Sequence, residues 1–132
     1  MNIKFRCWIK YQKEMKEVLS LDFINNKAYI AADKKNKPFG FIHFDDCELL
    51  QYVGTHDKTG IEIFEGDNIR FMYKNVEYIG EIAWDVSMFI ICNIDDTDSC
   101  IPLNNIVDSK DEQCNDAEII GNIYQNIDLM GV

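Results

Sequence analysis

The sequence contains no apolar run that approaches the ~20 residues needed to cross a bilayer as a helix. It does not open with a charged segment followed by an apolar one, so we expect no membrane segment and no secretion. Only two prolines and seven glycines are present, and the glycine spacing fits neither a dinucleotide fingerprint nor a phosphate loop. A sustained 3.6-residue period is also absent. We therefore expect a cytoplasmic protein that is not mainly helical and carries no nucleotide-binding motif.

Paired cysteines are lacking as well. The five cysteines are an odd number, and no two have the CxxC spacing, which predicts reduced thiols rather than a disulfide framework. Since His43 and His56 are the two histidines, the sequence predicts no metal site and no cofactor. The acidic segment that begins at Asp95 does not fit a calcium loop, because Ile101 and Val107 stand where such a loop needs glycine and glutamate.

Apolar and aromatic side chains are plentiful. Hydrophobic residues make up 47% of the chain, with eight Phe, six Tyr and two Trp, which excludes an intrinsically disordered protein. A chain of 132 residues buries roughly two-thirds of the surface that its unfolded form exposes. The composition therefore predicts a folded protein with a core of its own.

Charge is distributed unevenly along the chain. Residues 1–37 hold nine Lys or Arg against four Asp or Glu, a local charge of +5, whereas residues 38–132 hold four against nineteen, a local charge of −15. Two interpretations stay open: a basic face that packs on an acidic one, within a chain or between copies, or two solvated surfaces without a specific partner. The net charge of −10 disfavours binding to duplex DNA, because phosphate contacts need clustered Lys and Arg.

The first half of the chain has the two-residue period of strands. Two sets of side chains alternate at its start, Ile3, Phe5, Cys7 and Ile9 with Lys4, Arg6, Trp8 and Lys10. This alternation predicts a first strand with a basic outer face. Further strands are predicted at 18–24, 27–31 and 39–44, with a turn at Asn25 and Asn26 because asparagine tolerates a positive φ.

The second half predicts a small barrel. Strands at 68–73 and 76–84 flank Lys74-Asn75, a hairpin signal, and further strands are predicted at 88–92 and 118–124. Short strands joined by one long polar connection fit an SH3-like barrel. The fold class is thus mainly β with minor α, a basic β-rich part over 1–62 and an SH3-like barrel over 63–132. Four core residues are predicted for the barrel: Phe71, Ile82, Trp84 and Ile123.

Three segments of the chain resemble one known family. They are Phe5, Arg6 and Trp8 followed by Met15, then residues 49–71, and residues 119–126 near the end. These motifs are similar to those of the YopX family of phage and prophage proteins, whose molecular function is unknown. The resemblance implies a phage- or prophage-encoded protein in the cytoplasm of a bacterial host. It implies no catalytic residue.

One cluster of titratable residues could support acid–base chemistry. His56 and Asp57 precede Glu62, Glu65 and Asp67, and a histidine oriented by a carboxylate can act as a general base. This motivates a small acid/base enzyme centred on His56 as one alternative. No nucleophile motif accompanies the cluster, and Asp57 as a turn cap and Asp67 as a backbone acceptor are simpler interpretations.

The first strand motivates a second alternative, a module that binds single-stranded nucleic acid. The aromatic Phe5, Trp8 and Tyr11 are interspersed with the basic Arg6 and Lys10, as in proteins that stack bases. The competing interpretation places Phe5 and Trp8 in the core. A further hypothesis is a peptide groove lined by Trp84 and its aromatic neighbours, as small barrels provide for proline-rich ligands.

The preferred interpretation is a non-catalytic accessory protein that acts by protein–protein binding or self-assembly. Its partner is predicted to be a host or phage protein, a second copy of the chain, or both. The interaction surface is predicted to comprise Arg6, Trp8, Lys10, His56, Asp57 and Lys58.

Overall fold

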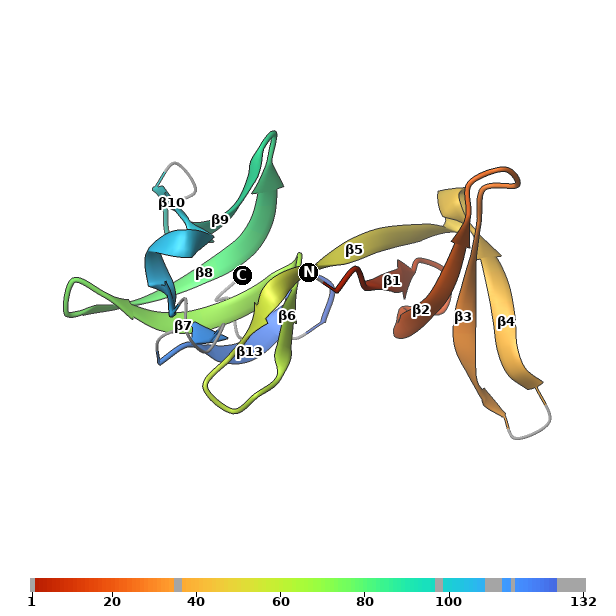
Figure 1. Ribbon diagram of the computed structural model, residues 1–132, viewed down its shortest axis with the longest axis horizontal. Helices are drawn as coiled ribbons and strands as arrows, with labels where there is room; N and C mark the ends of the chain where they lie inside the picture. Colours follow the sequence, from red (N-terminus) through yellow and green to blue (C-terminus); the bar gives the residue numbers. More distant parts are fainter. Residues whose placement is uncertain (1, 35–36, 97–98, 109–112, 115, 126–132) are drawn as a thin grey trace. The chain divides into compact units, whose positions relative to one another are not determined.

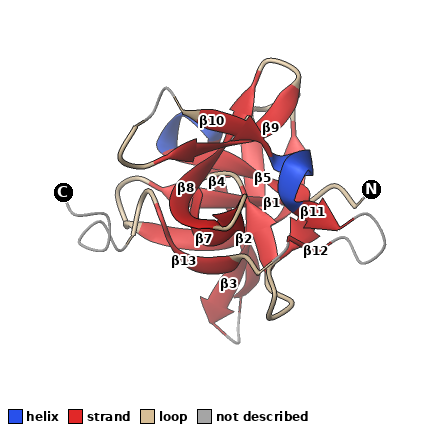
Figure 2. Ribbon diagram, turned by 90° about the vertical axis from the view of Figure 1, so that its left-hand side faces the viewer, coloured by secondary structure: helices blue, strands red, loops and turns tan. Residues whose placement is uncertain are grey.

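The computed structural model describes residues 2–34, 37–96, 99–108, 113–114 and 116–125. Strands form almost all of its regular structure, and the described helical segments are two short 3-10 turns (Figures 1 and 2). The mainly-β prediction is therefore confirmed. The chain divides into two compact units, here called the N-terminal unit (Asn2–Gln51) and the C-terminal unit (Tyr52–Val132).

The N-terminal unit is an antiparallel sheet with strand order β5-β1-β2-β3-β4. Its elements are β1 (Phe5–Ile9), β2 (Glu14–Asp22), β3 (Lys27–Lys34), β4 (Lys37–His43), the 3-10 turn η1 (Phe44–Asp46) and the first part of β5 (Cys47–His56). Asn26 has a φ of 56°, which fits the predicted turn between β2 and β3. Figure 1 shows β2, β3 and β4 side by side.

One face of this sheet forms the core of the N-terminal unit. Its buried members are Cys7, Ile9, Ala28, Ile42 and Cys47. They come from alternating positions of neighbouring strands, because successive strand residues point to opposite faces. The predicted alternation of the first strand is thus confirmed.

The C-terminal unit contains a five-stranded antiparallel sheet with strand order β10-β9-β8-β7-β13. Its elements are the end of β5, β6 (Glu62–Phe64), β7 (Asp67–Tyr73), β8 (Val76–Asp85), β9 (Met88–Asn93), β10 (Cys100–Pro102), η2 (Leu103–Ile106), β11 (Val107–Asp108), β12 (Gln113–Cys114) and β13 (Glu118–Asn122). The end of β5 pairs with β6, and with β12 in parallel. Its largest core side chains include Ile63, Ile69, Phe71, Ile82 and Ile91.

A tight turn makes the β7–β8 hairpin. Lys74 and Asn75 have φ values of 51° and 66°, the two successive positive angles that a two-residue hairpin turn of the I′ type requires. The hairpin predicted from the sequence is confirmed. Within the described residues β10 and β13 remain the edges of the sheet, and no closed barrel forms. The SH3-like barrel is thus not confirmed, and the domain boundary after Glu62 stays a prediction.

Two of the four predicted core residues are wrong. Phe71 and Ile82 are 4% and 1% exposed, as expected, but Trp84 and Ile123 are 52% and 36% exposed. Trp84 lies near the end of β8, beyond the last core residue on that face, and its ring packs edge-on against Phe89 at 4.8 Å. Strand alternation identified the correct face of β8 but not the point at which the core ends.

The cysteine prediction is also wrong in part. Cys92 and Cys100 form a disulfide, whereas Cys7 and Cys47 are free and buried. The pairing of β9 with β10 places Cys92 directly opposite Cys100, so their side chains meet across the two strands. Burial, with a contribution from Cys47 beside it, raises the pKa of the Cys7 thiol to about 12. We therefore expect Cys7 to be an inert core residue rather than a nucleophile.

Among the described residues, no helix combines the length and the apolar character needed to cross a bilayer.

Candidate functional site

The turn after β5 is organised by one buried carboxylate. Asp57 is 1% exposed, and its Oδ1 accepts hydrogen bonds from the Thr59 amide at 2.9 Å, the Thr59 hydroxyl at 2.7 Å and the Ile61 amide at 3.0 Å. Its Oδ2 accepts a fourth bond from the Ile119 amide of β13 at 3.2 Å. Asp57 is therefore the turn cap that the sequence favoured, and it also ties the turn to a strand 62 residues later.

These bonds determine the protonation of Asp57. Burial alone raises the pKa of its carboxyl, but the hydrogen bonds from Thr59, Ile61 and Ile119 outweigh burial, so the pKa lies below its usual value. A carboxylate held in this way is an ionised structural acceptor.

The neighbours of Asp57 are held by the same structure. The His56 ring nitrogen Nδ1 lies 2.9 Å from the Asp57 backbone oxygen. The Lys58 amide donates to the Ala117 oxygen at 2.9 Å, and its ammonium lies 3.6 Å from Glu118. Three residues of the predicted interaction surface thus share one turn, where they make structural bonds.

Asp67 accepts a hydrogen bond from the backbone, as the sequence favoured. Asp67 is 1% exposed, and its Oδ2 accepts a bond from the Phe64 amide at 2.8 Å at the start of β7. An acid/base role for His56 is not tested by these contacts and stays a prediction. Within the described part of the chain, no group of three or more His, Cys, Asp or Glu side chains could hold a metal ion.

The other predicted surface residues lie on β1. Arg6 and Trp8 are half-buried, on the sheet face opposite Cys7 and Ile9. Lys10 is exposed, and its ammonium lies 3.3 Å from the Asp45 backbone oxygen and 3.5 Å from the Glu48 carboxylate. Trp8 therefore lies between the two interpretations of its role, because it is neither fully buried in the core nor fully exposed.

A hollow of about 370 Å³ lies in the C-terminal unit. Three aromatic side chains line it, Phe71, Tyr73 and Tyr78, and the Phe71 and Tyr78 rings stack with centroids 5.8 Å apart. Asn93 and Ser99 add hydrogen-bonding groups to the lining. Aromatic side chains combined with a few hydrogen-bonding groups are common in the lining of ligand sites. The sequence predicted an aromatic groove around Trp84 instead. The hairpin signal at Lys74 did predict β7 and β8, the two strands that carry the aromatic side chains of the hollow.

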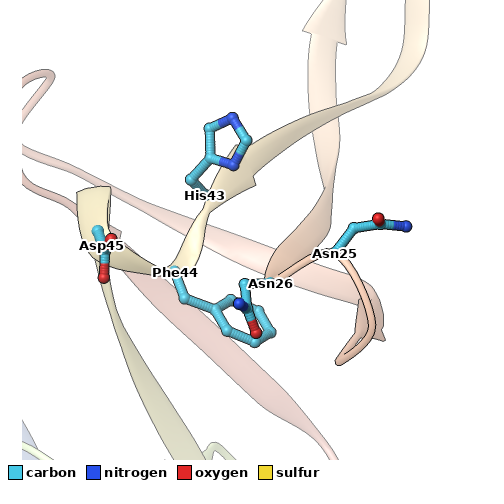
Figure 3. Close-up of a pocket in the computed structure, with 5 residues that line it drawn as sticks. All are labelled: Asn25, Asn26, His43, Phe44 and Asp45. Carbon is cyan, nitrogen blue, oxygen red and sulfur yellow. The ribbon is translucent and has the colours of Figure 1, made fainter.

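A second hollow, of about 470 Å³, lies in the N-terminal unit. It is lined by Asn25, Asn26, His43, Phe44 and Asp45, from the β2–β3 turn, the end of β4 and η1 (Figure 3). His43 and Asp45 extend in different directions in Figure 3, which does not favour cooperation between them in catalysis. The lining is mostly polar.

An aromatic surface on β3 and β4 was missed by the sequence interpretation. The register places four side chains on the face opposite the core, Lys27, Tyr29, Phe41 and His43. Phe41 is 54% exposed. The two-residue period in 27–31 and 39–43 could have revealed this surface, had the outer face of each strand been considered with the inner one.

Comparison with known proteins identifies the family. The model of the YopX protein family matches residues 4–131. The chain belongs to the YopX family. Among solved structures, it is similar to protein EF1440 from Enterococcus faecalis, with 25% sequence identity, a TM-score of 0.61, and coverage of 98% of this chain and 99% of the other. The chain matches no curated protein. The family match and the structural match each extend over the N-terminal and the C-terminal unit of this YopX protein.

Proposed function

We propose that this YopX-family chain is a phage- or prophage-encoded accessory protein that acts in the cytoplasm of its bacterial host by binding another protein, without catalysis. The observation that carries the proposal is the aromatic hollow of the C-terminal unit. Tyr73 and Tyr78, which are half-buried, offer flat, rigid surface at low conformational cost, and their hydroxyls can also form hydrogen bonds, while the buried Phe71 ring stacks against Tyr78.

The chemistry of the hollow favours an extended peptide segment as the ligand. Small β-barrels of the SH3 type use aromatic grooves to bind proline-rich segments, and an SH3-like arrangement of the C-terminal unit remains part of this proposal. Residues 52–132 hold four Lys or Arg against sixteen Asp or Glu, a local charge of −12. Such a field attracts basic partners and accelerates their association. We therefore propose a host or phage protein with an exposed, basic, proline- or aromatic-containing segment.

The roles of His56 and Asp57 support a non-catalytic function. Asp57 is held ionised by hydrogen bonds that stabilise the turn, and the His56 ring contacts the backbone of the same turn. A general base needs access to its substrate's proton. Their bonding favours a structural role for this pair over an enzymatic one.

Affinity capture followed by peptide mapping tests the proposal. We expect the protein to retain a specific bacterial or phage protein, and a fluorescent peptide from that protein to bind in anisotropy measurements. Tyr73→Ala should weaken the peptide about 30-fold, the effect of removing an aromatic hot spot of ~2 kcal/mol. Trp84→Ala is the matched control, because Trp84 is an exposed aromatic of the same unit outside the hollow. Equal affinities of the two variants for the peptide, or no specific capture, would refute the proposal.

Self-association is part of the same proposal. The basic residues 1–37 and the acidic remainder, repeated on each copy, can attract one another between chains, and edge strands such as β4 and β10 can accept a partner strand. Light scattering coupled to size exclusion should give a multiple of 15.4 kDa. The multiple should decrease as salt rises if charge holds the copies together, because screening acts over about 8 Å at physiological ionic strength. A mass of one chain at every protein and salt concentration would rule out association.

A further inference from the structure

The outer face of the β2–β3–β4 sheet has an unusual set of side chains. The register pairs Lys27 with His43 and Tyr29 with Phe41, so all four lie on the face opposite the core. On the inner face the neighbouring pair, Ala28 and Ile42, is 0% and 4% exposed. This outer face, defined by Lys27, Tyr29, Phe41 and His43, is called the aromatic face below.

The rings of the aromatic face form a row. The Phe41 centroid lies 6.3 Å from that of Tyr29 and 5.7 Å from that of His43, whose ring meets Phe41 edge-on. The Lys27 ammonium lies 4.4 Å from the Phe41 centroid. A cation over a ring at this distance is attracted to its π-electrons. The row therefore combines exposed π-surface with a positive charge at its centre.

We propose that the aromatic face binds single-stranded nucleic acid, with bases stacked on Phe41 and Tyr29 and with Lys27 moving from the Phe41 ring to the phosphates. Aromatic side chains on the exposed face of an antiparallel sheet are a general means of stacking two or three unpaired bases. Stacking on a ring does not depend on sequence, because every base has a π-face. The proposal does not depend on the peptide-binding role of the C-terminal unit.

Charge complementarity favours this negatively charged ligand over a basic or neutral one. The N-terminal unit, residues 2–51, holds nine Lys or Arg against seven Asp or Glu, a local charge of +2 in a chain whose net charge is −10. Lys34 and Lys37 are paired in register at the far end of the β3–β4 hairpin. The aromatic face thus belongs to the unit of the protein that has a positive net charge, and phosphate contacts supply most of the affinity in non-specific nucleic-acid binding.

The second hollow adjoins this face at His43 (Figure 3). Its lining includes the amides of Asn25 and Asn26 and the carboxylate of Asp45. A nucleobase carries hydrogen-bond donors and acceptors along its edge, which such polar groups can match. A duplex hides its base faces within the stack, so the arrangement suits a single strand.

Fluorescence anisotropy with a fluorescein-labelled dT20 oligonucleotide tests the proposal. Phe41→Ala should weaken binding by roughly 5- to 160-fold, the range for loss of one base–aromatic stack. The slope of log affinity against log salt is negative, and Lys27→Gln should make it less steep by about 0.7, the value for one phosphate contact in a single strand. Tyr11→Ala is the matched control, since Tyr11 is a 70% exposed aromatic of the same unit outside the aromatic face, and it should bind dT20 as the wild type does.

Three results of the binding measurements would overturn the proposal. They are no dT20 binding by the wild-type protein, equal affinities of the Phe41→Ala and Tyr11→Ala variants, and equally tight binding of a dT20·dA20 duplex. If Phe41→Ala changes the mass in light scattering and leaves dT20 binding intact, the face is a contact between proteins and the proposal fails. Phe41→Leu keeps an apolar side chain but removes the ring, so it separates stacking from any effect of Phe41→Ala on folding.

Discussion

Replacing Asp57 by alanine is expected to lower the free energy of unfolding by about 3–5 kcal/mol, since the amides left without an acceptor each cost ~1–3 kcal/mol when buried. The backbone amides of Thr59, Ile61 and Ile119 all lose their acceptor in this variant. A typical domain has only ~5–15 kcal/mol in total. Urea unfolding followed by circular dichroism measures the loss. Asp85→Ala, at an exposed position, is the control and should change stability by less than about 0.5 kcal/mol.

The contribution of Asp57 should depend on pH. Because its pKa is lower in the folded than in the unfolded chain, the charged carboxylate stabilises the fold above the unfolded pKa of about 3.9. That stability is lost as the pH falls through the lower, folded pKa. Asp57→Asn, which cannot ionise, should therefore lose less stability on acidification than the wild type. A loss below about 1 kcal/mol for Asp57→Ala at pH 7 would contradict the assigned role, because even one unsatisfied buried amide costs that much.

Asp57 also shows how far the sequence could predict this site. Aspartate four residues before Ile61, in a polar run that ends at Gly60, was enough to predict a turn cap, because that bonding is local. The bond to Ile119 joins residues 62 positions apart, so it depends on how β13 pairs with the sheet. Local chemistry was predictable at this turn, and the long-range bond was not.

The same distinction explains the missed features. Alternation predicted that Ile82 and Trp84 share a face, which is correct, but not that the core ends between them. The spacing of Cys92 and Cys100 gave no sign of their disulfide, because the register of β9 with β10 brings them together. The aromatic face likewise depends on the pairing of β3 with β4.

Glycine at position 80 should be essential to the packing of the C-terminal unit. A Cβ added to Gly80 would collide with Cγ2 of Ile91 and lie 3.0 Å from the Cys92 backbone oxygen and 3.3 Å from the Phe71 ring. These contacts come from the paired strand β9 and from the core, so little can move aside. We expect Gly80→Ala to lower the free energy of unfolding by about 2–3 kcal/mol, the cost of overpacking a close-packed core.

Gly40→Ala is the matched control for this prediction. Gly40 also lies within a strand, β4, but a Cβ at that position would have no neighbour within 4 Å. Alanine there should leave stability unchanged or raise it by up to about 1 kcal/mol, because it restricts the unfolded chain. Urea unfolding followed by tryptophan fluorescence suits the comparison, since Trp8 and Trp84 report on the N-terminal and C-terminal units respectively. Equal effects of the two substitutions would mean that the close approach of Ile91 to Gly80 is not required by the fold. If Gly80→Ala lowers stability and Gly40→Ala does not, the Gly80→Ala variant should also bind the peptide more weakly. The reason is that Phe71 and Ile91, which the added Cβ would contact, line the aromatic hollow.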